Sequence, residues 1–372
     1  MIGRTDNLAA ATGAPPPEIS ARARAGETLG SVSSWLRLSS NHPGAYLAVA
    51  SLGAALFVLS RDFPAQLPSW APWEFSWTEF LATALSLLWF FRGLGRSTRE
   101  RRPPIWRRLC FLLGVGSIYA VLQTRFDYFA QHMFFLNRIQ HVVMHHLGPF
   151  LVALGCCGGT VKAGMPTPVG RLLDAKWLRA GLALLQHPVV APVLFVGLIY
   201  LWLIPAVHFR AMTDPRLFQV MNWSMVGDGL LFWALVLDPR PRPPARLSYA
   251  LRAALAVGVM FPQIALGAII SFADRDLYPY YAFCGRLLPS VGAVADQRIG
   301  GVIIWIPPAM MSVAALVLAL NAIRLEEDSR QPAPDEAAMA DLARKWTGRQ
   351  QRLPAVSPGC DPESLVGALD RD

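Results

Sequence analysis

Eight apolar stretches, each about as long as a helix that crosses a lipid bilayer, recur along this chain. A segment in lipid must satisfy its own backbone N–H and C=O groups, so such stretches are expected to be helices. The 372 residues are 53% hydrophobic and only 16% charged, which is too apolar for a water-soluble domain. The sequence therefore predicts an all-α, polytopic membrane bundle of eight transmembrane helices, near residues 44–60, 77–95, 107–124, 141–158, 189–208, 221–237, 249–272 and 301–321.

The first stretch is the weakest candidate for a membrane span among the eight. Residues 44–60 are rich in alanine and glycine and only 17 residues long. A stretch of this kind also suits a surface or re-entrant helix. A bundle of seven spans is the alternative that this leaves open.

The positions of lysine and arginine give the orientation. Loops that stay in the cytoplasm carry most of the basic residues. Of the 34 Lys and Arg residues, 26 fall in or beside one set of alternating loops and 8 in or beside the other. Both termini are therefore predicted to be cytoplasmic, with a tail over 1–43, the bundle over 44–322 and a mostly disordered tail over 323–372.

The net charge of +9 does not indicate a nucleic-acid partner. The arginines gather in membrane-flanking loops such as "RSTRERRPPIWRR", residues 96–108, without a nucleic-acid motif. Anionic lipid headgroups explain this pattern. The first 42 residues hold no apolar core, so no cleaved signal peptide is expected. The chain is predicted to be a multi-pass membrane protein.

Histidines gather on the predicted outer side. The segment "HVVMHHLGPF" holds His141, His145 and His146, and His132 and His208 lie on the same side. On a regular helix, His141 and His145 lie about 40° apart on one face, about 6 Å apart along the axis. His146 points elsewhere on such a helix, unless Pro149 bends it.

This cluster predicts a metal site. Met144 lies beside the paired histidines, and Met133, Met212 and Met221 are expected near the same side. A set of imidazole and thioether ligands favours Cu(I) over Zn or Mg. The alternative is that histidines at a membrane interface serve as amphipathic anchors. Cys156 and Cys157 are two further possible ligands, although small residues in a helix interface explain them as well.

Two carboxylates add to the candidate site. Asp228 falls near the middle of a predicted span, where an unpaired carboxylate is costly. Its expected partner is Asn222, Gln263 or a histidine of the fourth span. Asp296, just before the last span, is expected either to cap that helix or to face the histidines.

Three motifs resemble those of the CtaG-type family of multi-span cytochrome c oxidase assembly factors, over residues 75–322. Departures from the family pattern at Asn137, Arg138, Asn222 and His145 indicate a divergent branch. The matching residues are Gln140, His141, Pro149 and Gly155, then Gly229 to Trp233, and then Asp296, Gln297, Gly300, Gly301, Trp305 and Pro307.

The resemblance implies a role in maturing a haem-copper oxidase rather than catalysis, in the bacterial inner (plasma) membrane. It implies oxidase subunits as partners, with copper bound or delivered at the outer face and a periplasmic copper chaperone as a possible donor. Four other functions remain open. They are a single-haem protein with His141 and His208 as ligands, a transporter built on Asp228, a di-iron desaturase or hydroxylase suggested by H-x-x-x-H-H, and a chaperone without metal.

Overall fold

Helices account for every regular element in the part of the chain that the structure describes. The computed structural model describes residues 43–330 and 336–350. All-α architecture is therefore confirmed for these residues. The elements are α2 (Gly44–Asp62), η1 (Pro64–Gln66), α3 (Trp77–Arg96), η2 (Arg99–Arg101), α4 (Ile105–Leu122), α5 (Arg125–His132), α6 (Phe134–Val142), η3 (Val143–Leu147), α7 (Gly148–Gly155), α8 (Gly158–Gly164), α9 (Thr167–Leu173), α10 (Lys176–Leu185), α11 (Val190–Leu203), α12 (Pro205–Thr213), α13 (Pro215–Val236), α14 (Tyr249–Ser271), α15 (Tyr280–Cys284), α16 (Ala293–Arg330) and α17 (Glu336–Gln350).

Each predicted apolar stretch coincides with a helix, but fewer than eight helices qualify as membrane spans by length and composition. Within the described residues, α2, α4, α14 and α16 qualify. Two pairs that bend by 77° and 69° would raise the number to six. The first pair joins 134–155 to α8, and the second joins α10 to α11. The count of eight and the cytoplasmic termini stay predictions.

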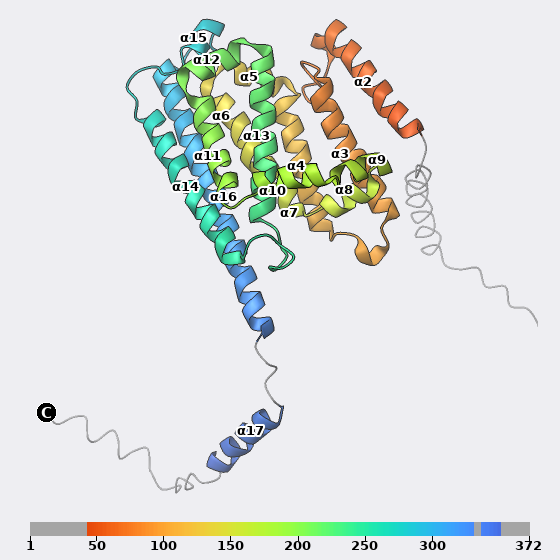
Figure 1. Cartoon of the computed structure of the whole chain (residues 1–372). Helices are drawn as coiled ribbons and strands as arrows, with labels where there is room; N and C mark the ends of the chain where they lie inside the picture. Colours follow the sequence, from red (N-terminus) through yellow and green to blue (C-terminus); the bar gives the residue numbers. More distant parts are fainter. Residues whose placement is uncertain (1–42, 331–335, 351–372) are drawn as a thin grey trace, which may run out of the picture. The chain divides into compact units, whose positions relative to one another are not determined.

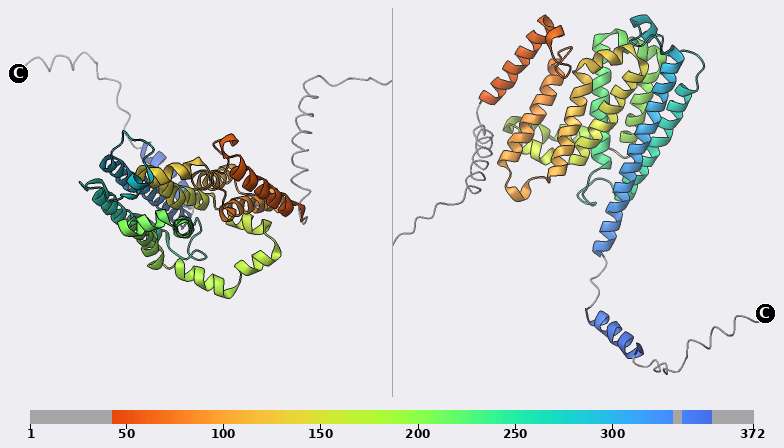
Figure 2. Two further views of the ribbon diagram at one scale, coloured as in Figure 1. Left: turned by 90° about the horizontal axis from the view of Figure 1, so that it is seen from above. Right: turned by 180° about the vertical axis from the view of Figure 1, so that it is seen from behind.

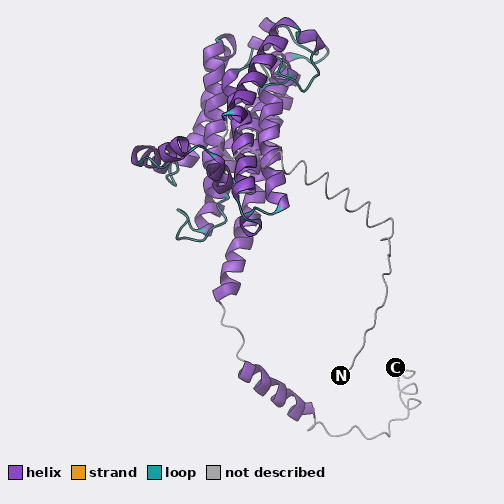
Figure 3. Ribbon diagram, turned by 90° about the vertical axis from the view of Figure 1, so that its right-hand side faces the viewer, coloured by secondary structure: helices purple, strands orange, loops and turns teal. Residues whose placement is uncertain are grey.

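The chain divides into two units, residues 1–322 and 323–372. In the first, the long helices stand side by side, with α2 at the edge next to α3 (Figure 1). Seen from above, α8 to α10 arch away from the bundle (Figure 2). The view coloured by secondary structure shows the same three helices lying across the direction of the others (Figure 3).

The second unit differs from its prediction in one respect. The tail 323–372 is predicted to be mostly disordered, whereas the structure has the helix α17 within it. Residues 331–335 and 351–372 lie outside the described part, as do residues 1–42 of the amino-terminal tail. Disorder there stays a prediction.

Several helices begin at a polar cap that the sequence supplies. The Asp214 carboxylate accepts from the N–H of Arg216 at 2.9 Å and precedes Pro215, a residue suited to the first turn of α13. The Ser248 hydroxyl accepts from Leu251 N–H at 3.3 Å and caps α14. These caps fix where α13 and α14 enter the bundle.

The helix that carries the histidines runs through the middle of the bundle. α6, η3 and α7 follow one another without a break from Phe134 to Gly155. α7 packs against α4 on one side and α13 on the other, and the π-helical turn η3 packs against the same two helices. Seven residues of this helix precede the predicted start at 141, which places the histidines deeper than the sequence predicts.

The earlier start has a physical cause. Asn137, Arg138 and Gln140 lower the hydropathy of this segment, yet all three are buried, at 0%, 1% and 0% exposure. Asp296 also accepts hydrogen bonds from the first two backbone N–H groups of α6. Capped and buried, these polar residues form the first two turns of the helix.

Gly229 lets α13 approach the histidine segment closely. A Cβ built on Gly229 would overlap the carbonyl oxygen of His145 and lie 3.0 Å from Cγ of Pro149. We expect Gly229→Ala to destabilise the protein by about 1–3 kcal/mol through overpacking. Thermal unfolding in detergent measures this.

Gly227 of the same helix is the matched control, because nothing lies within 4 Å of a Cβ built there. Gly227→Ala should be neutral or stabilising, since alanine favours a helix over glycine. Equal unfolding temperatures for the two variants would contradict the close contact.

Candidate functional site

The π-helical turn η3 determines where the histidines point. It spans Val143–Leu147 and so contains His145 and His146, which are 0% and 3% exposed. A π-helical turn widens the helix locally and changes the angle between successive side chains. The regular helix predicts that His146 points away from His141 and His145. This expectation is wrong, since all three side chains line one cavity.

A hydrogen-bonded chain links four side chains of three helices. His145 Nε2 lies 3.3 Å from a carboxylate oxygen of Asp228, and His145 Nδ1 lies 3.2 Å from His146 Nδ1. His146 Nε2 lies 2.8 Å from Oε1 of Gln263. The predicted partners of Asp228 included a histidine of the fourth span, and His145 is that histidine.

The amide of Gln263 sets the direction of this chain. Gln263 Nε2 donates to Val259 O at 2.9 Å, so Oε1 faces His146 as an acceptor. His146 therefore carries its hydrogen on Nε2 and accepts at Nδ1 from His145. His145 Nε2 and Asp228 are left to share one proton. All four ring nitrogens of the two histidines are thus occupied.

His141 differs from its neighbours. Its side chain is 5% exposed, and neither Nδ1 nor Nε2 has a hydrogen-bond partner among the described residues. A buried polar atom without a partner is rare, and it indicates a bound partner or a functional role. A neutral imidazole has one nitrogen with a lone pair, which can bind a metal ion, and one N–H group, which can donate a hydrogen bond; within the described residues neither is occupied at His141.

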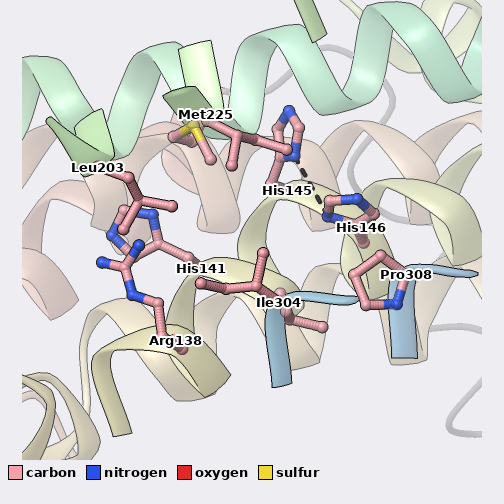
Figure 4. A pocket seen from close by; sticks show the side chains of 10 residues that line it. Arg138, His141, His145, His146, Leu203, Met225, Ile304 and Pro308 are labelled. Atoms are coloured by element: carbon pink, nitrogen blue, oxygen red, sulfur yellow. Dashed lines mark hydrogen bonds between the residues drawn. The ribbon is translucent and has the colours of Figure 1, made fainter. Parts of the chain in front are cut away.

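The cavity beside His141 is small. Its volume is about 20 Å³, enough for one or two atoms of water size. His141, His145 and His146 come from the central helix, and the thioether of Met225 approaches from α13 (Figure 4). The remaining walls are Arg138, Val142, Ile199, Leu203, Ile304 and Pro308.

Arg138 brings a positive charge to the same cavity. Its guanidinium donates to Oδ1 of Asn137 and lies 5.0 Å from the ring centre of Phe134. The side chain is 1% exposed, and its Nε has no partner among the described residues. The positive charge of Arg138 repels a metal cation bound in the cavity, and it repels a divalent ion more strongly than a monovalent one.

Three other predicted ligands lie elsewhere. His208 is fully buried and bonds Trp202 O at 3.1 Å and the Tyr281 hydroxyl at 3.0 Å, which occupies both ring nitrogens. His132 ends α5, bonds Tyr128 O at 2.8 Å and packs on that ring. Met144 is buried in an apolar cluster with residues such as Val121 and Met221. None of the three lines the His141 cavity.

Met225 is the cavity residue that the sequence analysis missed. It lies three residues before Asp228, and residues with this spacing share a face of a helix. Since Asp228 bonds His145, Met225 faces the same histidine segment. The three-residue spacing between Met225 and Asp228 was the feature of the sequence that could have identified Met225 as a cavity residue.

Asp296 caps a different helix from the one predicted. Its carboxylate accepts from the N–H groups of Phe134 at 3.0 Å and Phe135 at 2.8 Å, at the start of α6. It also pairs with Arg286 at 2.6 Å. Asp296 therefore neither caps its own helix α16 nor reaches the histidines. It holds α6 in place.

Gln297 and Trp305 also serve the packing of this region. Gln297 accepts from Leu277 N–H at 2.7 Å and donates to Ile270 O at 3.1 Å, which ties α16 to the end of α14 and the following loop. Trp305 packs against Gly267, where a built Cβ would lie 2.9 Å from Cβ of Trp305. These contacts fix α14 and α16 against each other.

No group of three or more His, Cys, Asp and Glu residues in the described part of the chain is arranged to hold a metal ion. The partnerless nitrogens of His141 and the thioether of Met225 nevertheless form a soft donor pair that suits Cu(I). Because Cu(I) carries a single positive charge, Arg138 repels it less strongly than it repels a divalent ion.

Comparison with known proteins agrees with the motifs. The model of the cytochrome c oxidase caa3 assembly factor family, Caa3_CtaG, matches residues 88–324. This is more than half of the chain. The chain belongs to this family. The matched range of the caa3 assembly factor runs from within α3 into α16 and includes every residue of the His141 cavity.

The resemblance seen in the sequence over 75–322 is therefore confirmed, with the match starting somewhat later. No curated protein and no solved structure matches this caa3 assembly factor. Within the described residues, four to six helices are long and apolar enough to cross a membrane, which identifies the chain as a membrane protein.

Asp127, on the short helix α5 outside the candidate spans, gives the caa3 assembly factor a pH-dependent stability. Burial raises the pKa of Asp127 to about 7. Hydrogen bonds from Gln140 and Gln131 lower this pKa, but their effect is smaller than that of burial. The folded state therefore holds a proton that the unfolded state loses above pH 3.8. The contribution of Asp127 to the free energy of unfolding should fall as pH rises from about 4 to about 7, by up to a few kcal/mol.

Thermal unfolding at pH 5 and pH 8 measures this dependence, with Asp127→Asn as the test variant. Asparagine cannot ionise, so the stability of the variant relative to the wild type should rise from pH 5 to pH 8, by up to a few kcal/mol. A stability difference between the two proteins that does not change with pH would contradict the assignment to Asp127.

Proposed function

We propose that this assembly factor helps to mature a caa3-type oxidase by holding one Cu(I) ion at the His141 cavity before it passes to an oxidase subunit. The observation that carries the proposal is that both ring nitrogens of His141 lack a partner in a buried cavity. The family supports the role in oxidase assembly. Copper is cargo in this proposal, so no catalytic step is needed.

The donors would be His141 and Met225. A third nitrogen becomes available only if the hydrogen bond between His145 and His146 opens. A site of two or three soft ligands holds Cu(I) and still releases it. Asp228, bonded to His145 Nε2, orients that ring behind the site.

Delivery at the outer face is part of the proposal. His141 lies seven residues after the first residue of α6, which is roughly 10 Å along the helix axis. Copper from a periplasmic chaperone would reach it from that end. The flanking arginines, such as those at 96–108, would contact anionic lipid headgroups on the opposite side.

The cavity argues against haem as the alternative. A volume of about 20 Å³ has no room for a macrocycle, and both nitrogens of His208 already have partners. The di-iron alternative needs several clustered histidines, and three line this cavity. No observation in the described residues favours a transporter over an assembly factor.

Deletion of this chain from cells that make a caa3 oxidase tests the assembly role. The oxidase should still be synthesised and should contain less copper, measured per haem a in the purified enzyme. Restoration by the wild-type chain is the control. Full copper content in the deletion strain would contradict the proposal.

A further inference from the structure

A second, larger cavity lies between α3, α4, α7 and α13, apart from the histidines. Its volume is about 150 Å³, close to that of cavities that bind a benzene-sized ring. Most of its wall is apolar and comes from α4, α7 and α13. These wall residues are Phe111, Val115, Ile118, Leu122, Val152 and Leu230.

One end of this cavity is polar. Gln123, at the carboxyl end of α4, is 1% exposed, and neither Nε2 nor Oε1 of its amide has a partner among the described residues. Its backbone is held, since its N–H donates to Tyr119 O and its carbonyl accepts from Trp73 N–H, both at 2.9 Å. The fixed backbone leaves the amide at the cavity wall, where its NH2 group can donate and its oxygen can accept hydrogen bonds.

Glu79 lies at the same cavity from the first turn of α3. Its side chain is 8% exposed, and no ion pair to it occurs in the part of the chain that the structure describes. The hydroxyls of Thr83 and Ser86 follow on the same helix. The polar groups therefore come from two helices and can contact two sides of one ligand.

The charges of the residues that line this cavity indicate whether its ligand is neutral or ionic. None of the described residues that line this cavity is a lysine, arginine or histidine. A phosphate or carboxylate headgroup would be buried beside Glu79 without a cation, which is costly. A neutral head with oxygen atoms can instead bond both to the Gln123 amide and to the Glu79 carboxyl.

We infer that the cavity between Gln123 and Glu79 binds a neutral, membrane-soluble ring compound with carbonyl or hydroxyl oxygens, of the quinone or quinol class. The ring fills the apolar volume, and its oxygens satisfy the Gln123 amide. Ala82 and Trp223, both exposed, line the cavity from α3 and α13 and form its open rim. An apolar substituent on the ring would extend past this rim into the lipid.

Equilibrium dialysis of the purified full-length protein against a benzoquinone with a short alkyl tail tests this site. Dodecanoate is the second probe, with an anionic head on a simple chain. The wild type should bind the quinone saturably, near one per chain, and should bind dodecanoate at least tenfold more weakly. No saturable quinone binding, or equal binding of dodecanoate, would overturn the inference.

Three variants locate the binding. Gln123→Leu removes the amide at similar size, and Ala82→Phe closes the rim from an exposed position. Each should raise the dissociation constant at least tenfold. Leu81→Phe, at an exposed neighbour outside the cavity, should leave it unchanged. Equal affinity in all three would place the quinone elsewhere and overturn the inference.

The test is independent of copper. Gln123 and Ala82 do not line the His141 cavity. Both variants should therefore keep the wild-type copper content while losing quinone binding, and His141→Ala should keep quinone binding.

Discussion

Asp296→Ala should destabilise the folded protein by about 3–5 kcal/mol. The carboxylate is fully buried, pairs with Arg286 at 2.6 Å and caps two N–H groups of α6. Its removal leaves the Arg286 guanidinium, whose side chain is 13% exposed, without its partner. Removing one member of a buried pair costs more than the pair itself contributes.

Asp274→Ala is the matched control for this prediction. Asp274 also pairs with an arginine, Arg298 at 3.4 Å, but its side chain is 95% exposed. A pair in solvent contributes about 0–1 kcal/mol. Thermal unfolding of both variants in one detergent separates the two cases. A loss below about 1 kcal/mol for Asp296→Ala would show that α6 does not depend on this cap.

His141→Ala should lower the activity of the caa3 oxidase in cells by at least tenfold. His141 is the histidine of the cavity whose nitrogens both lack partners, so it is the one most able to take a metal. The substitution removes no hydrogen bond within the described residues. The variant should therefore accumulate in the membrane at the wild-type level.

Three histidine variants serve as comparisons. His187, exposed before α11, and His132, bonded to Tyr128, lie outside the cavity, and alanine at either should leave oxidase activity near normal. His208→Ala breaks two hydrogen bonds of a buried ring, so it should lower the amount of folded protein. Equal activity in all four variants would mean that the His141 cavity has no special role.

The sequence predicts the helices of this protein well because lipid and a protein core both demand apolar residues. The α14 helix, predicted at 249–272, runs from Tyr249 to Ser271. Hydropathy fails for α6, whose first two turns hold Asn137, Arg138 and Gln140. Their polar groups are buried in the bundle, and hydropathy cannot distinguish such residues from a loop.

The candidate site could be predicted only in part. Three close histidines indicate a site, and the buried Asp228 requires a partner that the sequence narrows to a few choices. The π-helical turn, directly before Gly148 and Pro149, brings His146 to the same cavity as His141 and His145, and a regular helix does not predict this. His208 and Met144 share the chemistry of the site but do not line its cavity. The ring nitrogens of His208 bond Trp202 O and the Tyr281 hydroxyl, and Met144 is buried in the apolar cluster that surrounds the cavity.

Copper content per chain after loading with Cu(I) tests the central claim most directly. The purified wild type and His132→Ala should each retain about one copper after removal of unbound metal, and His141→Ala should retain none. Retention of copper by His141→Ala, or its absence from the wild type, would contradict the proposal that the His141 cavity carries copper to the oxidase.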